Sequence, residues 1–144
     1  MNTDDLVAAL RACAAGLYPL EAGTELLVGN GTFLRRGDFT TRFITRGTSG
    51  GTPMAAIDWD AAITTLASGG LPCSGGERRM LLLSASLANG NPVNLQDAVT
   101  GLDRSNIARL VTAIRRAGGE GLSGPPPFPE PRDRCPHAPP AGLF

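Results

Sequence analysis

The sequence predicts an all-α fold, a compact bundle of about six or seven short helices with a disordered proline-rich C-terminal tail. Three observations support this prediction. Apolar residues recur every three or four positions through most of the first 118 residues, which is the period of a helix that buries one face. Capping residues and glycine stops separate these stretches. Eight of the twelve prolines come after Gly119. We therefore divide the chain into a helical domain, 1–119, and a disordered tail, 120–144.

The N-terminal third predicts a kinked helix or helical hairpin over 4–28, with Thr3 as its cap and Pro19 as its kink or end. A short helix carrying three apolar residues follows, with Asp38 as its cap. The stretch RGTSGGTP, 46–53, is too rich in glycine for regular structure and is expected to be a mobile loop.

The next two predicted helices have clear start signals. Asp58 caps a helix in which Trp59 begins a row of apolar residues at helical spacing, and Gly69-Gly70 ends it. Ser74 and Glu77 form a capping-box pattern before a longer helix. We expect the following residues of that helix to be buried: Met80, Leu83, Leu87 and Ala88.

The last two predicted helices lie close together in the sequence. Asn94 caps a short helix that ends at Gly101, and Asp103 caps the final one, which stops at Gly118-Gly119. Arg115 and Arg116 suit the negative C-terminal end of that helix. We expect its buried face to carry Ile107, Leu110, Val111 and Ile114.

Composition limits the function classes. Thirteen basic residues, all arginine, balance thirteen acids, so the chain lacks the overall positive charge typical of nucleic-acid-binding and membrane-surface proteins. Three widely separated cysteines predict neither a disulfide framework nor a Cys-x-x-Cys site. The N-terminus carries acids where a signal peptide carries positive charge, and no apolar run is long enough to span a membrane. We expect a cytoplasmic protein.

Residues 74–103 resemble an ABC-type ATPase between its signature motif and the loop after Walker B. Ser74-Gly75-Gly76-Glu77 is similar to the signature, and Asp97 falls at about the Walker B spacing. Ala98 stands where that family places its catalytic glutamate, and residues 93–96 are polar for a buried strand. The chain has neither a phosphate-binding GxxxxGK[ST] loop nor any lysine. We therefore interpret this segment as a capped amphipathic helix followed by two short helices.

Two groups of arginines are candidate contact residues. Residues 94–117 have helix-turn-helix spacing, in which Arg104 and Arg109 would face DNA. Against this, the polar Asp97 stands where the crossing of the two helices favours a small apolar residue. The second group alternates with Phe33, Phe39 and Phe43, a pattern that can hold nucleic acid by phosphate contact and stacking. We favour a solvated arginine face over a phenylalanine core for this group: Arg35, Arg36, Arg42 and Arg46.

Catalysis and metal binding have few candidate residues. The single histidine, His137, lies in the predicted disordered tail, so no cysteine–histidine or serine–histidine pair is expected in the folded domain. Cys135 and His137 have no further ligand nearby. Asp58 and Asp60 lie near a helix start, where acids commonly serve as caps. We predict no catalytic residue, no cofactor site and no metal site.

The stretches DLVAALRACAAGLYPLEAGTELLV, WDAAITTL and LPCSGGERRMLLLSASLANGNPVNLQDAVTGLDRSNIARLVTAIRRAGG resemble a group of small helical proteins of high-GC Gram-positive bacteria with no assigned activity. This resemblance covers about residues 4–118 and implies a small helical domain. We expect an interaction or regulatory protein without catalytic activity, whose partner is another protein and which needs no membrane or metal. A helix-turn-helix DNA-binding regulator using 94–117 is the alternative, and an enzyme with an unrecognised site comes third.

Overall fold

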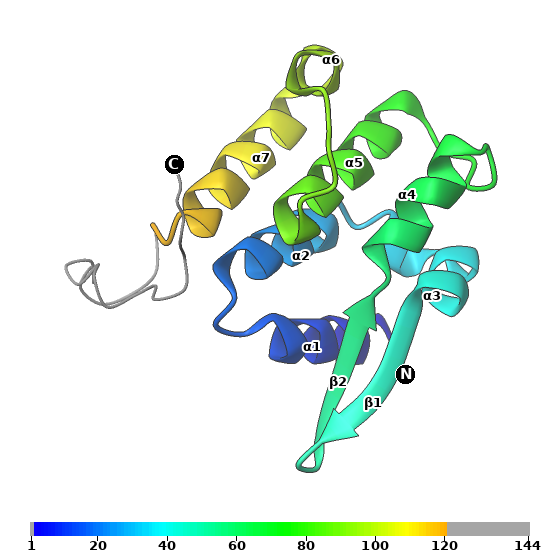
Figure 1. The fold of residues 1–144 in the computed structure, drawn as a ribbon, viewed down its shortest axis with the longest axis vertical. Coiled ribbons are helices and arrows are strands. Elements are labelled where there is room, and N and C mark those ends of the chain that lie inside the picture. The colour runs from blue at the N-terminus through cyan, green and yellow to red at the C-terminus, as the bar shows by residue number, and fades with distance from the viewer. Residues whose placement is uncertain (1, 121–144) are drawn as a thin grey trace, which may run out of the picture.

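The computed structural model describes residues 2–120 of the 144-residue chain (Figure 1). Within that range the chain forms seven α-helices, one 3-10 turn (η1) and one two-stranded hairpin, so the predicted helical class is confirmed with the hairpin as an addition. The predicted tail beyond Glu120 lies outside the described residues. In chain order the elements are α1 (Thr3–Ala14), α2 (Tyr18–Asn30), η1 (Phe33–Arg35), α3 (Gly37–Phe43), β1 (Ile44–Ser49), β2 (Thr52–Ile57), α4 (Trp59–Ala67), α5 (Gly75–Asn89), α6 (Leu95–Thr100) and α7 (Arg104–Ala117).

Helices α1 and α2 form the predicted helical hairpin, although the residues that bound them differ from expectation. The cap of α1 is Asn2, whose Oδ1 accepts a hydrogen bond from Asp5 N at 2.8 Å, and Thr3 is already helical. Pro19 lies in the first turn of α2 and does not end α1, because a proline in the first turn sacrifices no intrahelical hydrogen bond. The break falls at 15–17, where Gly16 takes a φ of 87°.

The prediction of a mobile loop at 46–53 is wrong, since these residues form most of an antiparallel hairpin. Ile44 pairs with Ile57 and Ser49 with Thr52, which leaves a two-residue turn at Gly50-Gly51. Both glycines have positive φ, 59° and 84°, as the tight turns that match strand twist require. The glycines that led us to predict an irregular loop therefore form the turn of the hairpin. The hairpin packs against α1 through β2 and extends to the bottom of Figure 1.

Most expected helix starts after residue 57 are confirmed. The side chains of Asp58, Asn94 and Asp103 each accept a hydrogen bond from the backbone three residues on. Ser74 and Glu77 exchange both bonds of the capping box, at 3.1 and 2.9 Å.

Asp38, the predicted cap of the short helix α3, does not cap it. Arg36 occupies the N-cap position, and Asp38 lies in the first turn and binds the Arg36 side chain instead.

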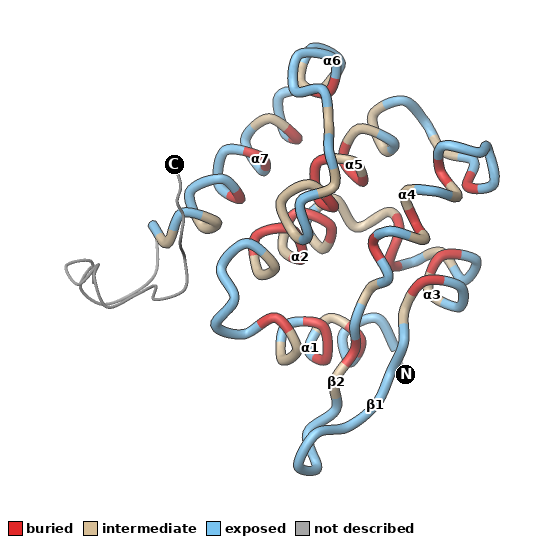
Figure 2. The backbone as a smooth tube through the Cα atoms, in the orientation of Figure 1, coloured by how far each residue is buried: buried red, intermediate tan, exposed pale blue. Residues whose placement is uncertain are grey.

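Two groups of buried side chains form the core. The first contains all the aromatic residues that are buried within 2–120: Phe33, Phe39, Phe43 and Trp59. The second is aliphatic and lies among α2, α5, α6 and α7. Helices α2 and α5 contribute to both groups and lie at the centre of the molecule (Figure 2). No helix within the described residues is both long and apolar enough to cross a bilayer.

Candidate interaction surface on helix α7

The structure separates the six arginines proposed as contact residues. Arg46 lies on the hairpin, while Arg104 begins α7 next to α6, and the hairpin tip and α6 lie at opposite ends of the molecule in Figure 1. Arg35 ends η1 and lines a shallow groove between α1 and the end of α2. The six residues therefore do not form one continuous basic site.

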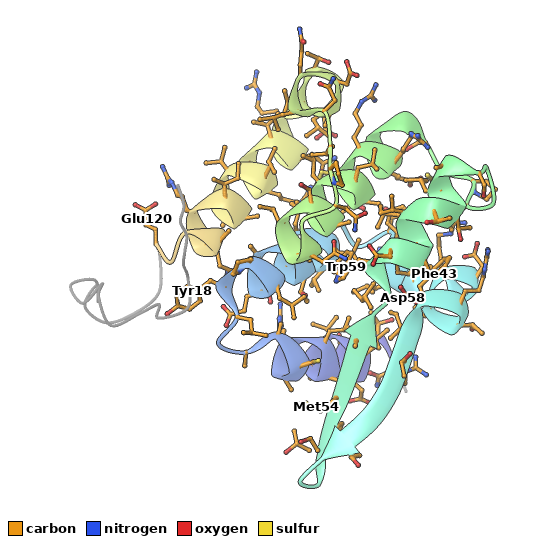
Figure 3. The ribbon with its side chains drawn as sticks, viewed as in Figure 1. Tyr18, Phe43, Met54, Asp58, Trp59 and Glu120 are labelled. Carbon is orange, nitrogen blue, oxygen red and sulfur yellow. The ribbon has the colours of Figure 1, made fainter. Side chains whose placement is uncertain are left out.

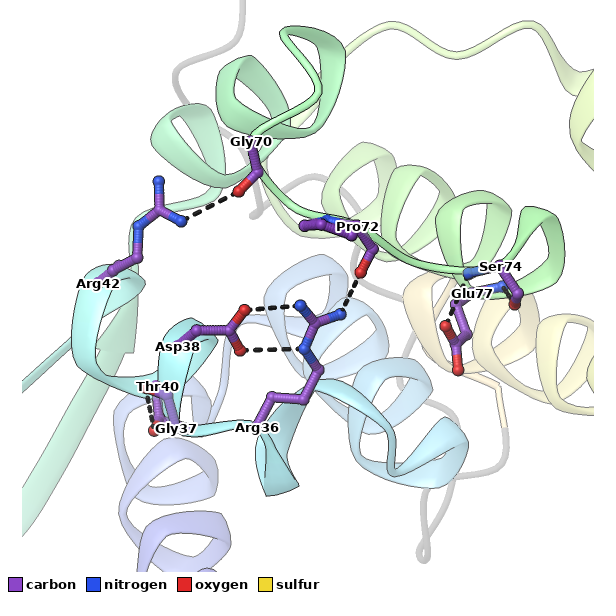
Figure 4. Close-up of polar contacts among 9 residues, drawn as sticks. All are labelled: Arg36, Gly37, Asp38, Thr40, Arg42, Gly70, Pro72, Ser74 and Glu77. Atoms are coloured by element: carbon purple, nitrogen blue, oxygen red, sulfur yellow. Dashed lines mark hydrogen bonds and ion pairs between the residues drawn. The ribbon is translucent and has the colours of Figure 1, made fainter.

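Arg36 and Arg42 bind other parts of the fold. Arg36 makes two hydrogen bonds to Asp38, at 3.0 and 2.6 Å, and donates a third to the Pro72 carbonyl at 2.7 Å (Figure 4). Arg42 donates to the Gly70 carbonyl at 3.1 Å and lies over the ring of Phe43. Together they attach α3 to the connection between α4 and α5.

These contacts change the acidity of nearby groups. The hydrogen bonds from Arg36, supported by its charge, lower the pKa of Asp38 and raise that of Arg36 itself. Burial raises the pKa of the Cys73 thiol, with a further contribution from Glu77, so the thiolate of Cys73 is disfavoured.

The phenylalanine rings near these arginines lie inside the core. Phe33 and Phe39 have no exposed surface and Phe43 has 4%. The ring of Phe39 lies 5.2 Å from each of the other two, measured between centroids. Rings buried in this way cannot stack on a nucleotide base, so the aromatic half of the proposed binding pattern is not on the surface.

Helix α7 carries the remaining two candidates, Arg104 and Arg109. Arg109 donates to Asn106 Oδ1 at 2.9 Å and lines a groove of about 330 Å³ between α7 and α2. The side chain of Arg104 is exposed and makes no hydrogen bond or ion pair with another residue in 2–120. It is therefore available to a partner.

Helix α7 is held firmly against α2 in an antiparallel arrangement. Arg116 Nη1 lies 3.3 Å from Glu21 Oε1, and Gly29, at the other end of α2, lies beside the Arg109 side chain. At its C-terminus, Gly119 has a φ of 90° and the amide of Glu120 donates to the Arg115 carbonyl at 2.8 Å, as in a Schellman cap. Tyr18 lies next to Gly119, below the end of α7 in Figure 3.

The prediction of which residues of α7 are buried is partly wrong. Leu110 and Ala113 are buried as part of the aliphatic core, but Val111 is 44% exposed and Ile114 is 50% exposed. Ile107 is half-buried and belongs to neither core group. These three residues recur at the spacing of one helix face, about a quarter of a turn away from the buried row. We call Ile107, Val111 and Ile114 the outer row of α7.

The outer row is bordered by positive charge. At 100° per residue, Arg104 and Arg115 follow Val111 around the helix on the solvent side. Arg115 lies 3.5 Å from Glu120, and both side chains are largely exposed. Helix α7 contains four arginines and no acid. The helix therefore presents an apolar stripe with a basic border. Figure 2 shows that much of α7 is exposed along its outer side.

Sequence reasoning missed the outer row because it assigned all the apolar residues of α7 to one buried face. The signal is present in the sequence: Leu110, Ala113 and Ala117 alone complete an inward face at helical spacing, which leaves three larger apolar residues over. The apolar surface of α7 is therefore wider than that of a helix that only faces the core.

The two segments that suggested other activities take helical or irregular structure. Residues 93 and 94 are not part of a strand and Leu95 begins α6, so the segment compared with Walker B is not a buried strand. Helices α6 and α7 form the expected pair, but α6 has only six residues and α7 packs mainly on α2. In residues 2–120 no three histidine, cysteine or acidic side chains come together as a metal site requires. Cys135 and His137 lie outside the described residues.

Comparison with known proteins does not assign this chain to a family. Neither the family models, nor the curated proteins, nor the solved structures contain a match to this chain. Functional conclusions therefore depend on the geometry of the residues described above.

Proposed function

We propose that this chain is a non-catalytic interaction protein that binds an acidic, amphipathic segment of another protein along the outer row of α7. The observation that supports the proposal is the half-exposure of Val111 and Ile114 on a helix whose other apolar residues already complete the core. Apolar side chains at this spacing are the anchors that an amphipathic helix uses when it packs into a groove or against another helix.

The charges around the row indicate the chemistry of the partner. Arg104 and Arg115 border it, and no acid occurs within α7. A partner helix with apolar anchors and acidic flanks would cover the row and neutralise these arginines. Such complementarity mainly sets orientation and the association rate, while the buried anchors supply most of the affinity.

The exposed large apolar residues outside the outer row also lie in the part of the molecule that contains α7. The large hydrophobic side chains of residues 2–120 that are exposed all lie at the start of α2, in α6 or in α7: Leu17, Tyr18, Leu95, Val111 and Ile114. Tyr18 touches the C-terminal end of α7 through Gly119. The hairpin, α3 and α4 contribute none. Apolar exposure concentrated on one part of a small protein is typical of an interaction surface.

The proposal is tested by capture of partners from the protein's own cell extract with the full chain immobilised, followed by cross-linking to locate the bound segment. A variant with Val111→Ser and Ile114→Ser should lose the captured protein at least tenfold, because it removes both exposed anchors while leaving Leu110 and Ala113 in the core. Leu95→Ser, an exposed apolar residue on α6, is the matched control for reduced surface hydrophobicity and should retain most of the binding.

The captured segment must be acidic, and its binding must weaken for Arg104→Ala with Arg115→Ala. Equal capture by all variants, or a cross-linked segment without acidic residues, would contradict the proposal. Circular dichroism of each variant shows whether the helices are intact.

DNA binding is the second candidate, and one observation favours it: the solvent side of α7 carries Arg104, Ser105, Thr112 and Arg115 with no acid among them. In this case the chain would be retained on duplex DNA with an affinity that falls steeply as salt rises, through release of counterions. Arg104→Ala with Arg109→Ala should then reduce retention and the salt slope, whereas the Val111 and Ile114 variant should not. The Val111 and Ile114 variant therefore separates the two candidates, because it should lose the captured protein but keep its retention on DNA.

A further inference from the structure

A pocket of about 270 Å³ lies between α1, β2 and the C-terminal end of α5, and none of its lining residues belongs to α7. Its walls come from five elements: α1, α2, β2, α4 and α5. Leu10 and Trp59 line it and are almost fully buried, at 3% and 5% exposure, so the pocket reaches into the interior. Figure 3 labels Trp59 where α4 begins, directly after β2.

Short side chains create the space. Ala14, Ala55, Ala56 and Ala88 all line the pocket, and Ala14 and Ala55 have only 2% exposure. A cavity kept open by alanines in an otherwise tightly packed interior can accept a ligand, since an apolar space of about 150 Å³ is enough for benzene. The pocket here has room for a somewhat larger molecule of about ten non-hydrogen atoms.

Two polar groups in the wall have no protein partner. Thr24, at 3% exposure, and Trp59 line the pocket, and neither the threonine hydroxyl nor the indole N–H makes a hydrogen bond to another residue in 2–120. Neither atom is among the fully buried side-chain atoms of residues 2–120 that lack a partner, which are Asn30 Oδ1 and Ser84 Oγ, so both keep some contact with solvent. A molecule in the pocket can replace that solvent contact with a hydrogen bond.

One residue of the pocket wall is held by a hydrogen-bonded cluster. Asn89 lines the pocket, and its side-chain amide donates to Asp60 Oδ1 at 3.3 Å and accepts from the backbone N–H of Asn91 at 3.2 Å. The Asn91 side chain also donates to Asp60 Oδ1 at 3.0 Å. These contacts hold Asn89 in place, so this part of the wall has a defined shape.

The lining contains no arginine and no acid. A charged ligand would lose its hydration without gaining an opposite charge, which disfavours it strongly. We propose that this pocket binds a small, neutral, mostly apolar molecule with one hydrogen-bonding group, of the size class of phenols and indoles. The proposal is independent of the partner that α7 binds.

The test uses four probes of similar size: phenol, toluene, cyclohexanol and benzoate. Thermal unfolding of the full chain should shift upward by about 5 °C at ten times the dissociation constant of phenol or cyclohexanol. Trp59 is the single tryptophan of the chain, so its emission should change with cyclohexanol, which does not itself absorb in that range. Benzoate should produce neither change.

Two variants locate the binding. Ala14→Met places a long side chain in the pocket and should weaken phenol binding at least tenfold, whereas Ala8→Met, on the exposed side of the same helix, should leave it unchanged. Thr24→Val keeps the shape and removes the hydroxyl, so it should weaken phenol about fivefold and leave toluene unaffected.

The proposal is overturned if none of the neutral probes shifts the unfolding temperature, if benzoate binds as well as phenol, or if Ala14→Met binds phenol like the wild type. If Ala14→Met does not fold, the comparison of phenol with toluene in Thr24→Val still decides the question. Equal losses for both probes in that variant would also count against it.

Discussion

The two core regions of this protein are built in different ways. Around η1, α3, the hairpin and α4, four aromatic side chains fill the interior, and Arg36 and Arg42 close its edge through carbonyl groups of the α4–α5 connection. Among α2, α5 and α7 the core has no aromatic residue, and Gly23 lets α2 approach the backbone of α5. Large side chains fill most of the first region, apart from the pocket beside Trp59, whereas in the second region the helices approach closely and leave less space to fill.

This difference explains where apolar residues are left exposed. Small side chains at the inner face of α7 bring it close to its neighbours, and a single row is then enough to complete the core. The larger residues of α7, Val111 and Ile114, have no place inside and face solvent. The aromatic region has no such surplus, because its bulky residues are all needed to fill it. We infer that the closely packed half is the one suited to meet a partner.

Gly23→Ala should have the largest effect on the close approach of α2 and α5. A Cβ at this position would lie 2.5 Å from the Ser84 carbonyl oxygen and 2.6 Å from the Cβ of Ala88. Because neither atom is on a flexible side chain, the helices must separate, and we expect a loss of about 3 kcal/mol in the free energy of unfolding. Urea denaturation followed by circular dichroism measures this change.

Gly29→Ala, in the same helix, is the matched control. Its Cβ would meet only the flexible side chain of Arg109, with Cδ at 3.4 Å and Nε at 3.7 Å, so the higher helix propensity of alanine should stabilise the protein by about 0.5 kcal/mol. If both variants changed stability by the same amount, close approach at Gly23 would not be what holds α2 to α5.

Gly51→Ala tests the aromatic region through its hairpin. The φ of 84° at this position costs an alanine about 1 kcal/mol, whereas Gly47→Ala, with ordinary φ and nothing within 4 Å of its Cβ, should cost less than half as much. Hydrogen exchange of the strand amides should rise in Gly51→Ala before the helices are affected, since an isolated two-stranded sheet is only marginally stable. Equal exchange in both variants would show that the turn does not control the hairpin.

Much of the helical part of the fold could be predicted from sequence because its signals are local. Asp58, Ser74, Asn94 and Asp103 each bind the backbone three residues on, so a short stretch of sequence contains the whole interaction. The hairpin was missed although Gly50-Gly51 between threonine-rich strands is a turn signal in its own right. The high glycine content of this stretch was interpreted as a lack of regular structure. In fact the two adjacent turn residues have positive φ angles, which glycine adopts readily.

The candidate sites depend on contacts between distant segments and were therefore less predictable. The pocket forms where α1, β2 and α5 meet, and no local pattern brings Cys13, Ala55 and Asn89 together. The arginines near Phe39 were recognised as a group, but their division between internal contacts and free surface depends on the position of Pro72 and Gly70. For α7 the spacing was recognised, and only the packing of α2 and α5 decides which of its two apolar rows is buried.

The smallest expected effect concerns the arginine contacts at the edge of the aromatic region. Because Arg36 lowers the pKa of Asp38 below its usual 3.8, the ionised carboxylate stabilises the folded state above that pH, and the contribution is lost as the pH falls through the lower folded value. Asp38→Asn should therefore lower the unfolding temperature by about 2 °C at pH 7, since exposed ion pairs contribute little. The variant and the wild type should converge as the pH falls below the folded pKa of Asp38.

Arg36→Gln is the partner variant for this measurement, because the same pair is broken from its other side. It should lose more than Asp38→Asn, since Arg36 also donates to the Pro72 carbonyl at 2.7 Å. In the double variant the two losses should not add, as expected for residues in direct contact. Additive losses, or a difference between Asp38→Asn and wild type that does not shrink as the pH is lowered from 7, would mean that the pair does not attach α3 to the α4–α5 connection, and that the aromatic core alone holds this region together.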